Sequence, residues 1–305
     1  MSYITAVFWQ IEINAPKEHA AEIEEFFLKS GAQSTFELLY EEGRTSNLIE
    51  DNTQLFFFFA ENFPARAFAP MALATLGFAD LEFKISQVQY ADYLKEFEKS
   101  FRAFALTQKT ALVPPWDAEN ADIGPGFKKL WLVPGMAFGT GKHATTQLMV
   151  EFIEKTIRPS DTVIDIGSGS GILAIAAMLW GAASAWGVDV ETLAVESAAA
   201  NKTLNEERHG AAFACEFAVG DFSTLHERTI DRANTVFLAN ILPNIFEANA
   251  ADLKFALANC RAWALSGIPS AQEESFTAFL KTIAPGSFEI RTKEDWQIYF
   301  CQNSL

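Results

Sequence analysis

Cysteine is scarce in this sequence: Cys215, Cys260 and Cys301 are the three found among 305 residues. An odd number of cysteines, without C-x-x-C spacing or a paired histidine, excludes the usual patterns of a disulfide framework and of a zinc site. We therefore expect no metal. We also expect a reducing compartment, which makes the cytoplasm the predicted location.

Long hydrophobic runs and a basic N-terminus are also missing. The opening MSYITAVFWQIEIN lacks the positive start and the continuous apolar core of a signal peptide, and Glu12 lies within its apolar segment. No stretch reaches the roughly 18 uninterrupted apolar residues of a membrane span. The run from Phe56 to Phe59 is typical of a strand between two buried layers. We expect no membrane partner.

Positive charge is in the minority, because 23 Lys and Arg face 39 Asp and Glu, for a net charge of −16. Nucleic-acid-binding proteins usually present basic surfaces, so no direct nucleic-acid binding is expected. An acidic chain favours a basic partner, although acidity can also serve solubility alone. Apolar residues, by contrast, make up 50% of the sequence, enough for the cores of two domains at this length.

The first 88 residues have the pattern of a ferredoxin-like α+β domain. Strands are expected at residues 6–13, 34–40, 54–59 and 81–88, and helices between Pro16 and Gly31 and after Pro64. This order is β-α-β-β-α-β. Residues 89–127 are expected to be a linker, with an amphipathic connecting helix at 91–104 and a loop rich in Pro, Gly and acids at 113–126.

From residue 128 to residue 305, strands and helices alternate. A short strand, a glycine-rich loop and a helix from about Thr145 come first, and the alternation then continues to the end of the sequence. Such alternation predicts an α/β domain with a mostly parallel, seven-stranded sheet covered on both faces. The last two strands are separated by only TKED, so they must be antiparallel.

The segment TVIDIGSGSG within this domain has the pattern of strand, tight turn and helix start. Gly167, Gly169 and Gly171 let the backbone approach a ligand where a Cβ would collide. A dinucleotide site would have its third glycine at the position of Ile172. Asp165 is unfavourable beside a pyrophosphate and favourable beside a cation. S-adenosylmethionine, an adenosine with a sulfonium and no phosphate, therefore fits best, while an NAD-like cofactor stays open from this motif alone.

Three polar residues end the following strands. Asp189 can accept hydrogen bonds from both hydroxyls of an adenosine ribose, in either cofactor. Asp221 can accept from an adenine amino group with Phe222 near the ring, and the alternative is an ordinary helix cap. Asn240, in Asn-Ile-Leu-Pro, is placed like the asparagine of the Asn-Pro-Pro-aromatic turn with which many amine methyltransferases hold the amine nitrogen toward the methyl group.

The loop PGMAFGTGKHATT, the turn DIGSGSGILAIAA and the segment ANIL together resemble the bacterial ribosomal protein L11 methyltransferase family, PrmA. The resemblance covers nearly the whole chain, including GAQSTFEL and the C-terminal LSG. It implies a Rossmann-like S-adenosylmethionine-dependent methyltransferase domain over residues 128–305 and substrate capture by residues 1–88. It also implies methylation of the N-terminal α-amino and lysine ε-amino groups of L11, with S-adenosylhomocysteine as product. By position, Thr146, Gly167, Asp189 and Asn240 correspond to its cofactor-binding residues.

The residues expected to bind the cofactor are Thr145, Thr146, Asp165, Gly167, Gly169, Gly171, Asp189, Asp221 and Asn240. Asn240 is also expected to orient the amine, and Phe138, Gly139 and His143 to belong to a loop over the site. No dedicated base is assigned, because desolvation and a nearby sulfonium both lower the amine pKa from its ordinary value near ~10.4.

Several positions depart from the family's pattern, among them Tyr93 and Phe97, which replace linker tryptophans. Val133 replaces an Asp before Pro-Gly, Lys142 replaces a small hydroxyl residue before His143, and Ala144 replaces a Pro. Two alternatives therefore stay open: a methyltransferase acting on another protein or a small amine, and a non-catalytic binding factor on the same fold. We expect a monomer in each case.

Overall fold

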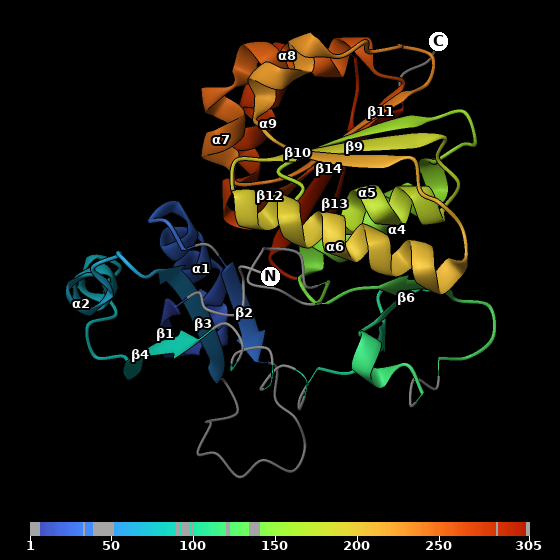
Figure 1. Ribbon diagram of the computed structural model, residues 1–305. Helices are drawn as coiled ribbons and strands as arrows, with labels where there is room; N and C mark the ends of the chain where they lie inside the picture. The colour runs from blue at the N-terminus through green and yellow to red at the C-terminus, as the bar shows by residue number, and fades with distance from the viewer. Residues whose placement is uncertain are drawn as a thin grey trace. The chain divides into compact units, whose positions relative to one another are not determined.

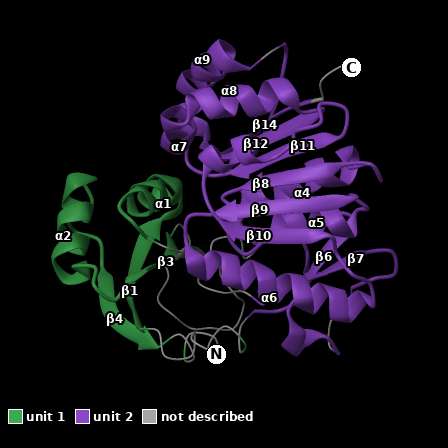
Figure 2. Ribbon diagram, turned by 45° about the horizontal axis from the view of Figure 1, so that its top comes forward, with its two compact units in different colours: residues 1–100 green, residues 101–305 purple. Residues whose placement is uncertain are grey.

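The computed structural model of the chain divides into two compact units, Met1–Ser100 and Phe101–Leu305 (Figure 2). The structure describes residues 7–32, 34–38, 52–89, 101–119, 123–133, 141–284 and 286–302, with Asp92, Lys95 and Glu98. Most of the expected connecting helix at 91–104 and the last two residues of the expected strand at 34–40 lie outside these residues.

The first unit contains a four-stranded antiparallel sheet with the strand order β2-β3-β1-β4. Its elements are β1 (Val7–Pro16), η2 (Lys17–His19), α1 (Ala20–Lys29), β2 (Ser34–Leu38), β3 (Asn52–Ala60), α2 (Ala65–Thr75) and β4 (Phe83–Gln89). Alternate residues of β1 and β3, such as Ile11 and Phe57, form one core with apolar residues of the two helices. Gly31 follows α1 with a φ of +99°, and Pro70 lies inside α2.

A seven-stranded sheet dominates the second unit, with the order β10-β9-β8-β11-β12-β14-β13. Its strands are β8 (Thr162–Ile166), β9 (Ser184–Asp189), β10 (Cys215–Val219), β11 (Thr235–Asn240), β12 (Ala262–Pro269), β13 (Glu289–Lys293) and β14 (Trp296–Gln302). The pairs from β10 to β12 are parallel, and β14 is antiparallel to both of its neighbours. The predicted mostly parallel sheet and its antiparallel last pair are thus confirmed.

Helices cover both faces of this sheet (Figure 1). One face carries α4 (Ala144–Thr156), α5 (Ile172–Leu179) and α6 (Thr192–His209). The other carries η4 (Phe222–Glu227), α7 (Pro243–Ala248), α8 (Ala250–Asn259) and α9 (Glu273–Ile283). A large core that includes Phe237, Trp263 and Tyr299 lies under the second group. Because successive parallel strands end at the same edge, the loops after β8, β9 and β11 gather at one side of the sheet.

A small three-stranded sheet combines two strands from the expected linker with the short strand expected at the start of the domain from residue 128. It consists of β5 (Phe104–Ala105), β6 (Thr110–Val113) and β7 (Lys128–Trp131), with β5 antiparallel and β7 parallel to β6. The short helix η3 (Pro115–Asp117) follows β6, and the Asp117 carboxylate accepts a hydrogen bond from the Ala103 N–H at 2.7 Å. The boundary between the two compact units, at Ser100 and Phe101, therefore falls within the expected linker.

None of the three cysteines, all of which the structure describes, forms a disulfide, and Cys215 and Cys260 are buried. Burial raises the pKa of both Cys215 and Cys260 to about 12, so neither is a reactive thiolate at neutral pH. In the described part of the chain, no group of three or more His, Cys, Asp or Glu side chains is placed to hold a metal ion. Across the same residues, none of the helices combines the length and the apolar character that crossing a bilayer requires.

Candidate active site

The glycine turn joins β8 to α5 and requires glycine for its backbone and for its space. Gly167, Gly169 and Gly171 have φ values of +72°, +52° and +78°, a region that side chains disfavour. A Cβ on Gly167 would lie 2.3 Å from the Cγ2 of Ile241, and one on Gly171 would lie 2.8 Å from the Cβ of Ala198. Glycine is therefore required at this turn both for the left-handed backbone and because neighbouring segments leave no room for a side chain.

Asp165, near the end of β8, is a fully buried carboxylic acid. Its Oδ2 accepts a hydrogen bond from the Ala174 N–H at 3.2 Å, while its Oδ1 has no hydrogen-bond partner among the described residues. Burial raises the pKa of this carboxyl to about 7; the Ala174 N–H opposes the rise and Asp189 adds to it. A cation bound nearby would favour the ionised form.

Asp189 ends β9 and braces the glycine turn. Its Oδ2 accepts from the Gly169 N–H at 2.8 Å, and its Oδ1 accepts from the Glu191 N–H at 3.0 Å. Each carboxylate oxygen keeps a further lone pair with which to accept a ligand hydroxyl. Val190 and Val219 lie beside it with 67% and 55% exposure, and Val219 is the register partner of Asp189. The acid thus borders an exposed apolar surface.

Asp221 has a local structural task. Its carboxylate accepts hydrogen bonds from the N–H and the hydroxyl of Ser223, at 2.9 and 2.6 Å, and so caps η4. These bonds lower the pKa of Asp221. Phe222 is buried in the core under η4. The capping alternative considered from the sequence is therefore present, and any adenine contact by Asp221 has to involve its remaining lone pairs.

A chain of polar contacts links the start of α4 to the end of β11. His143 is the N-cap of α4, and its Nδ1 lies 2.7 Å from the Oγ1 of Thr145. The same Oγ1 lies 3.2 Å from the Nδ2 of Asn240. Asn240 is 8% exposed, and its buried Oδ1 has no hydrogen-bond partner among the described residues. The buried Thr146 Oγ1 likewise has no partner in that part of the chain.

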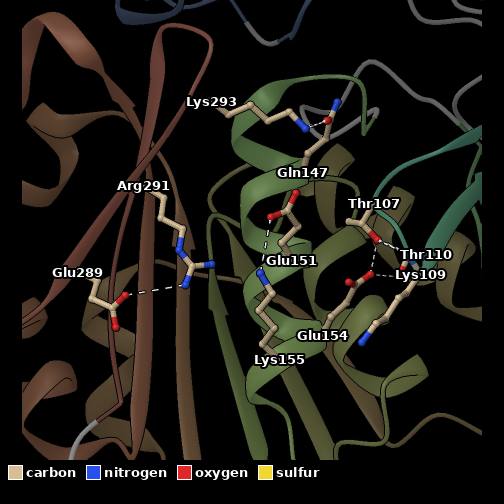
Figure 3. Close-up of polar contacts among 10 residues, drawn as sticks. All are labelled: Thr107, Lys109, Thr110, Gln147, Glu151, Glu154, Lys155, Glu289, Arg291 and Lys293. Atoms are coloured by element: carbon tan, nitrogen blue, oxygen red, sulfur yellow. Dashed lines mark hydrogen bonds and ion pairs between the residues drawn. The ribbon is translucent and has the colours of Figure 1, made fainter.

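Helix α4 is held from both flanks (Figure 3). Near its start, Gln147 accepts a hydrogen bond from Lys293 of β13. Near its end, Glu154 accepts from the hydroxyls of Thr107 and Thr110, the second at 2.6 Å. Lys293 belongs to the seven-stranded sheet, Thr110 to the three-stranded sheet, and Thr107 to the turn between β5 and β6. They fix the helix whose first turn contains Thr145 and Thr146.

Comparison with known proteins agrees with this arrangement. A family model described as ribosomal protein L11 methyltransferase (PrmA) matches residues 7–303. The chain belongs to this family. Similar relatives are the ribosomal protein L11 methyltransferases of Bacillus cytotoxicus and Bacillus cereus (strain AH820), which are 34% and 32% identical over 220 residues, 72% of this chain and 68% of each relative. A crystal structure of ribosomal protein L11 methylase from Lactobacillus delbrueckii subsp. bulgaricus matches with a TM-score of 0.51 and 26% identity, covering 67% of this chain and 100% of that one.

Residues of this methyltransferase that sequence reasoning missed hold the site together. Asn201 of α6 accepts from the Val133 N–H at 3.0 Å and donates to the Ser170 carbonyl at 3.0 Å. One turn later, Asn205 accepts from the Trp131 N–H and donates to the Trp131 carbonyl. Both asparagines are buried. Two such residues four apart on a mainly polar helix were the available signal, because buried amides need partners.

The departures from the PrmA pattern have identifiable surroundings. The backbone N–H of Val133, rather than its side chain, makes the contact with Asn201. Lys142 is exposed, and its Nζ lies 5.0 Å from the centroid of the Phe101 ring, within cation–π range. Ala144 is the buried first residue of α4. Phe138 and Gly139, expected in the loop over the site, lie outside the described residues.

The residues of this methyltransferase fit the cofactor that its sequence predicts. Buried oxygens without a described partner occur in the glycine turn, in β8, in α4 and in β11. They belong to Ser168, Asp165, Thr146 and Asn240. Such atoms are strongly disfavoured unless a ligand or water pairs with them. A polar, positively charged nucleoside would satisfy both these groups and the carboxylates.

Proposed function

We propose that this protein transfers methyl groups from S-adenosylmethionine to the lysine ε-amino groups and the N-terminal α-amino group of ribosomal protein L11. Membership of the L11 methyltransferase family and the names of its relatives support this substrate. The single structural observation behind amine methylation is the buried Oδ1 of Asn240, an acceptor without a described partner at the end of β11.

The proposed cofactor site uses residues from the ends of β8, β9 and β10 and from the first turn of α4. Asp189 would accept from the ribose hydroxyls, and the exposed Val190 and Val219 would contact the adenine ring. Thr146 and Asp165 would pair with the polar end of the cofactor. When bound there, S-adenosylmethionine supplies an electrophilic methyl group on a sulfonium centre.

The protein's task in the reaction is to present a neutral amine. A lysine ammonium has an ordinary pKa near ~10.4, and a buried site lowers it because desolvation penalises the charged form. In the proposed arrangement, Asn240 Oδ1 accepts a hydrogen bond from an N–H of the neutral amine, and the amine lone pair then points toward the methyl group. Alignment of nitrogen, carbon and sulfur supplies much of the remaining acceleration.

We further propose that residues 1–88 are a ferredoxin-like domain that captures L11, that residues 89–127 link the domains, and that residues 128–305 form the catalytic domain. The order β-α-β-β-α-β and the sheet order β2-β3-β1-β4 support the ferredoxin-like assignment. The net charge of −16 suits a basic substrate protein. We propose that the enzyme works as a cytoplasmic monomer and without contacting nucleic acid.

Incubation with methyl-tritiated S-adenosylmethionine and purified L11 tests the activity. We expect label in L11, and mass spectrometry of its peptides should place that label on amines. Asn240→Ala should reduce kcat by about a hundredfold, because an orienting contact is lost. Asn244→Ala is the matched control, since Asn244 is exposed on α7 and the same atoms are removed.

The outcomes separate the alternatives. No label in L11, with labelled bands of other sizes in a cell lysate, would reassign the enzyme to another substrate. No binding of S-adenosylmethionine in calorimetry at millimolar ligand would instead favour a non-catalytic binding factor. Removal of residues 1–88 should leave cofactor binding unchanged and raise the KM for L11; efficient L11 methylation by the shortened protein would contradict the capture role.

A further inference from the structure

We propose that Thr145 is a positioning residue, which turns the amide of Asn240 so that Oδ1 faces the methyl-accepting amine. This inference rests on the amine methylation proposed above. Two hydrogen bonds join His143 to Thr145 and Thr145 to Asn240. Which atom donates in each bond decides how the Asn240 amide is oriented. That orientation follows from the start of α4.

The first link is the tautomer of His143. Its side chain caps α4, where the Nδ1 accepts a hydrogen bond from the Thr145 N–H at 3.3 Å. A backbone N–H can only donate, so this ring nitrogen must be an acceptor. An imidazole nitrogen that accepts has no proton, and the neutral ring therefore has its proton on Nε2.

The second link is the hydroxyl of Thr145. Its Oγ1 lies 2.7 Å from the same unprotonated Nδ1, and only a hydroxyl hydrogen can join these two atoms. The single hydrogen of the hydroxyl is then used, and the oxygen is left as an acceptor. Because Thr145 is fully buried, its hydroxyl cannot turn toward bulk solvent instead.

The third link is the amide of Asn240. An acceptor oxygen 3.2 Å away requires a donor, so the NH₂ group of Asn240 must point toward Thr145. The carbonyl oxygen then points the opposite way, and it is this Oδ1 that is buried without a described partner. The cap of α4 thus determines which end of the Asn240 amide, 95 residues away in sequence, is presented to a ligand.

This orientation has a chemical consequence for the amine. A carbonyl oxygen accepts from an amine N–H and leaves the nitrogen lone pair available for the methyl group. The reversed amide would present an NH₂ group, which would donate to that lone pair and compete with methyl transfer. The Asn240 side chain therefore assists the reaction in one orientation and opposes it in the other, and the hydrogen bond with the Thr145 hydroxyl selects the orientation.

Contacts around His143, Thr145 and Asn240 hold the three residues in place. The ring of His143 packs edge-on against Trp296 of β14, with centroids 4.6 Å apart. Gln147 and Glu154 fix α4 from its two flanks (Figure 3). A functional group held by such supporting contacts keeps the orientation that it needs for reaction.

Kinetics of two threonine variants test the proposal. Thr145→Val keeps the shape and removes the hydroxyl, and we expect kcat for L11 to fall by about ten- to a hundredfold. Although Thr145 was expected from the sequence to bind the cofactor, its hydroxyl is paired with His143 and Asn240, so the Kd for S-adenosylmethionine, measured by calorimetry, should stay within about threefold of wild type. Thr145→Ser restores the hydroxyl and should recover most of the lost kcat. An unchanged kcat in Thr145→Val, or a Thr145→Ser variant as slow as Thr145→Val, would overturn the proposal.

A spectroscopic test is independent of the substrate. The chain has four histidines, so the ring nitrogens of a ¹⁵N-histidine-labelled sample can be assigned with His143→Gln as the reference. We expect neutral His143 to have its proton on Nε2, and Thr145→Val to shift its Nδ1 resonance. A proton on Nδ1 would reverse the chain and refute the inference. Absence of L11 methylation alone would refute the proposed substrate, while the tautomer would still decide the direction of the hydrogen bonds.

Discussion

The Cγ2 of Ile241 lies 2.3 Å from the position that a Cβ on Gly167 would take. Ile241 also limits a second glycine, because a Cβ on Gly267 would lie 2.3 Å from the Ile241 carbonyl oxygen. Gly167 follows β8 and Gly267 lies in β12, and these two strands are the neighbours of β11 in the sheet. The segment after Asn240 is thus fitted between two positions that have no side chain.

Replacement of Gly167 by alanine should weaken S-adenosylmethionine binding at least tenfold. The substitution adds both left-handed strain, of about 1–2 kcal/mol, and the collision with Ile241. Ile241→Ala removes the colliding methyl group, so the double variant should recover part of the affinity measured by calorimetry.

The control is Gly181→Ala, because Gly181 has a φ of +98° and nothing lies within 4 Å of the position that a Cβ there would take. It should lose stability without losing cofactor affinity. A double variant that binds no better than Gly167→Ala alone would show that strain, rather than contact with Ile241, controls the turn.

Asp189→Ala should raise the Kd for S-adenosylmethionine by about ten- to a hundredfold, since bonds to a charged acceptor contribute roughly 1.5–3 kcal/mol. The variant removes both the proposed ribose acceptor and the brace on the Gly169 N–H. Glu191→Gln removes the same charge two residues later from an exposed side chain and should change the Kd by less than about threefold. Equal effects of the two variants would point to a general effect of charge.

The buried Asp165 predicts a pH-dependent stability. Its folded-state pKa of about 7 lies above its ordinary value, so the folded protein retains a proton that the unfolded chain releases as pH rises from about 4 to about 7. The free energy of unfolding should therefore fall across this window, by up to about 1.4 kcal/mol per pH unit from this group. Urea unfolding at several pH values measures it.

Asp165→Asn cannot ionise and should lose this component of the slope, which makes it the matched control. Because a bound cation favours the carboxylate, S-adenosylmethionine should bind wild type more tightly as pH rises through 7, with a smaller change for S-adenosylhomocysteine, which lacks the sulfonium. Identical pH profiles for wild type and Asp165→Asn would rule out this role of the carboxyl.

A buried ion pair anchors β12 to the loop before β8. The Nε of Arg261 donates to Asp161 Oδ1 at 3.1 Å, and its Nη2 donates to the Thr156 carbonyl at 3.0 Å. Arg261→Met should lower the free energy of unfolding by about 3–5 kcal/mol, because it leaves the Asp161 charge buried and unpaired. Lys155→Met, which removes a cation 4.0 Å from Glu151 at the surface, should change it by less than about 1 kcal/mol.

Local sequence signals predicted the elements around the glycine turn well. As TVIDIGSGSG predicts, β8 ends before the glycine turn and α5 begins at Ile172 directly after it, and Asn240 ends β11 as expected. These segments combine apolar runs with glycines, so periodicity and turn chemistry agree. The strands β5 and β6 were missed, because two to four residues are too few to show a period, and their stability comes from pairing with one another and with β7. Helices α7 and α8 were also not anticipated.

The site was less predictable than the fold where its contacts are distant in sequence. Asp165, Asp189 and Asn240 could be named because strand ends carry ligand groups in parallel sheets. The bond between Thr145 and Asn240 joins residues 95 positions apart, and no local pattern indicates it. The same holds for Ile241, whose importance depends on glycines of two other strands. Packing across strands decides such partners, and a single sequence does not encode it in any short motif.

The position of β14 in the sheet determines how late in synthesis the sheet can be completed. Although β14 follows β13 in the chain, it lies between β12 and β13 in the sheet. While residues 296–302 are still inside the ribosome, β12 has an open edge, β13 has no neighbouring strand, and His143 lacks the ring of Trp296. During synthesis, domains generally fold as units, the N-terminal domain first. For this sheet, translation must pass residue 302 before the nascent chain can close the edge that supports α4.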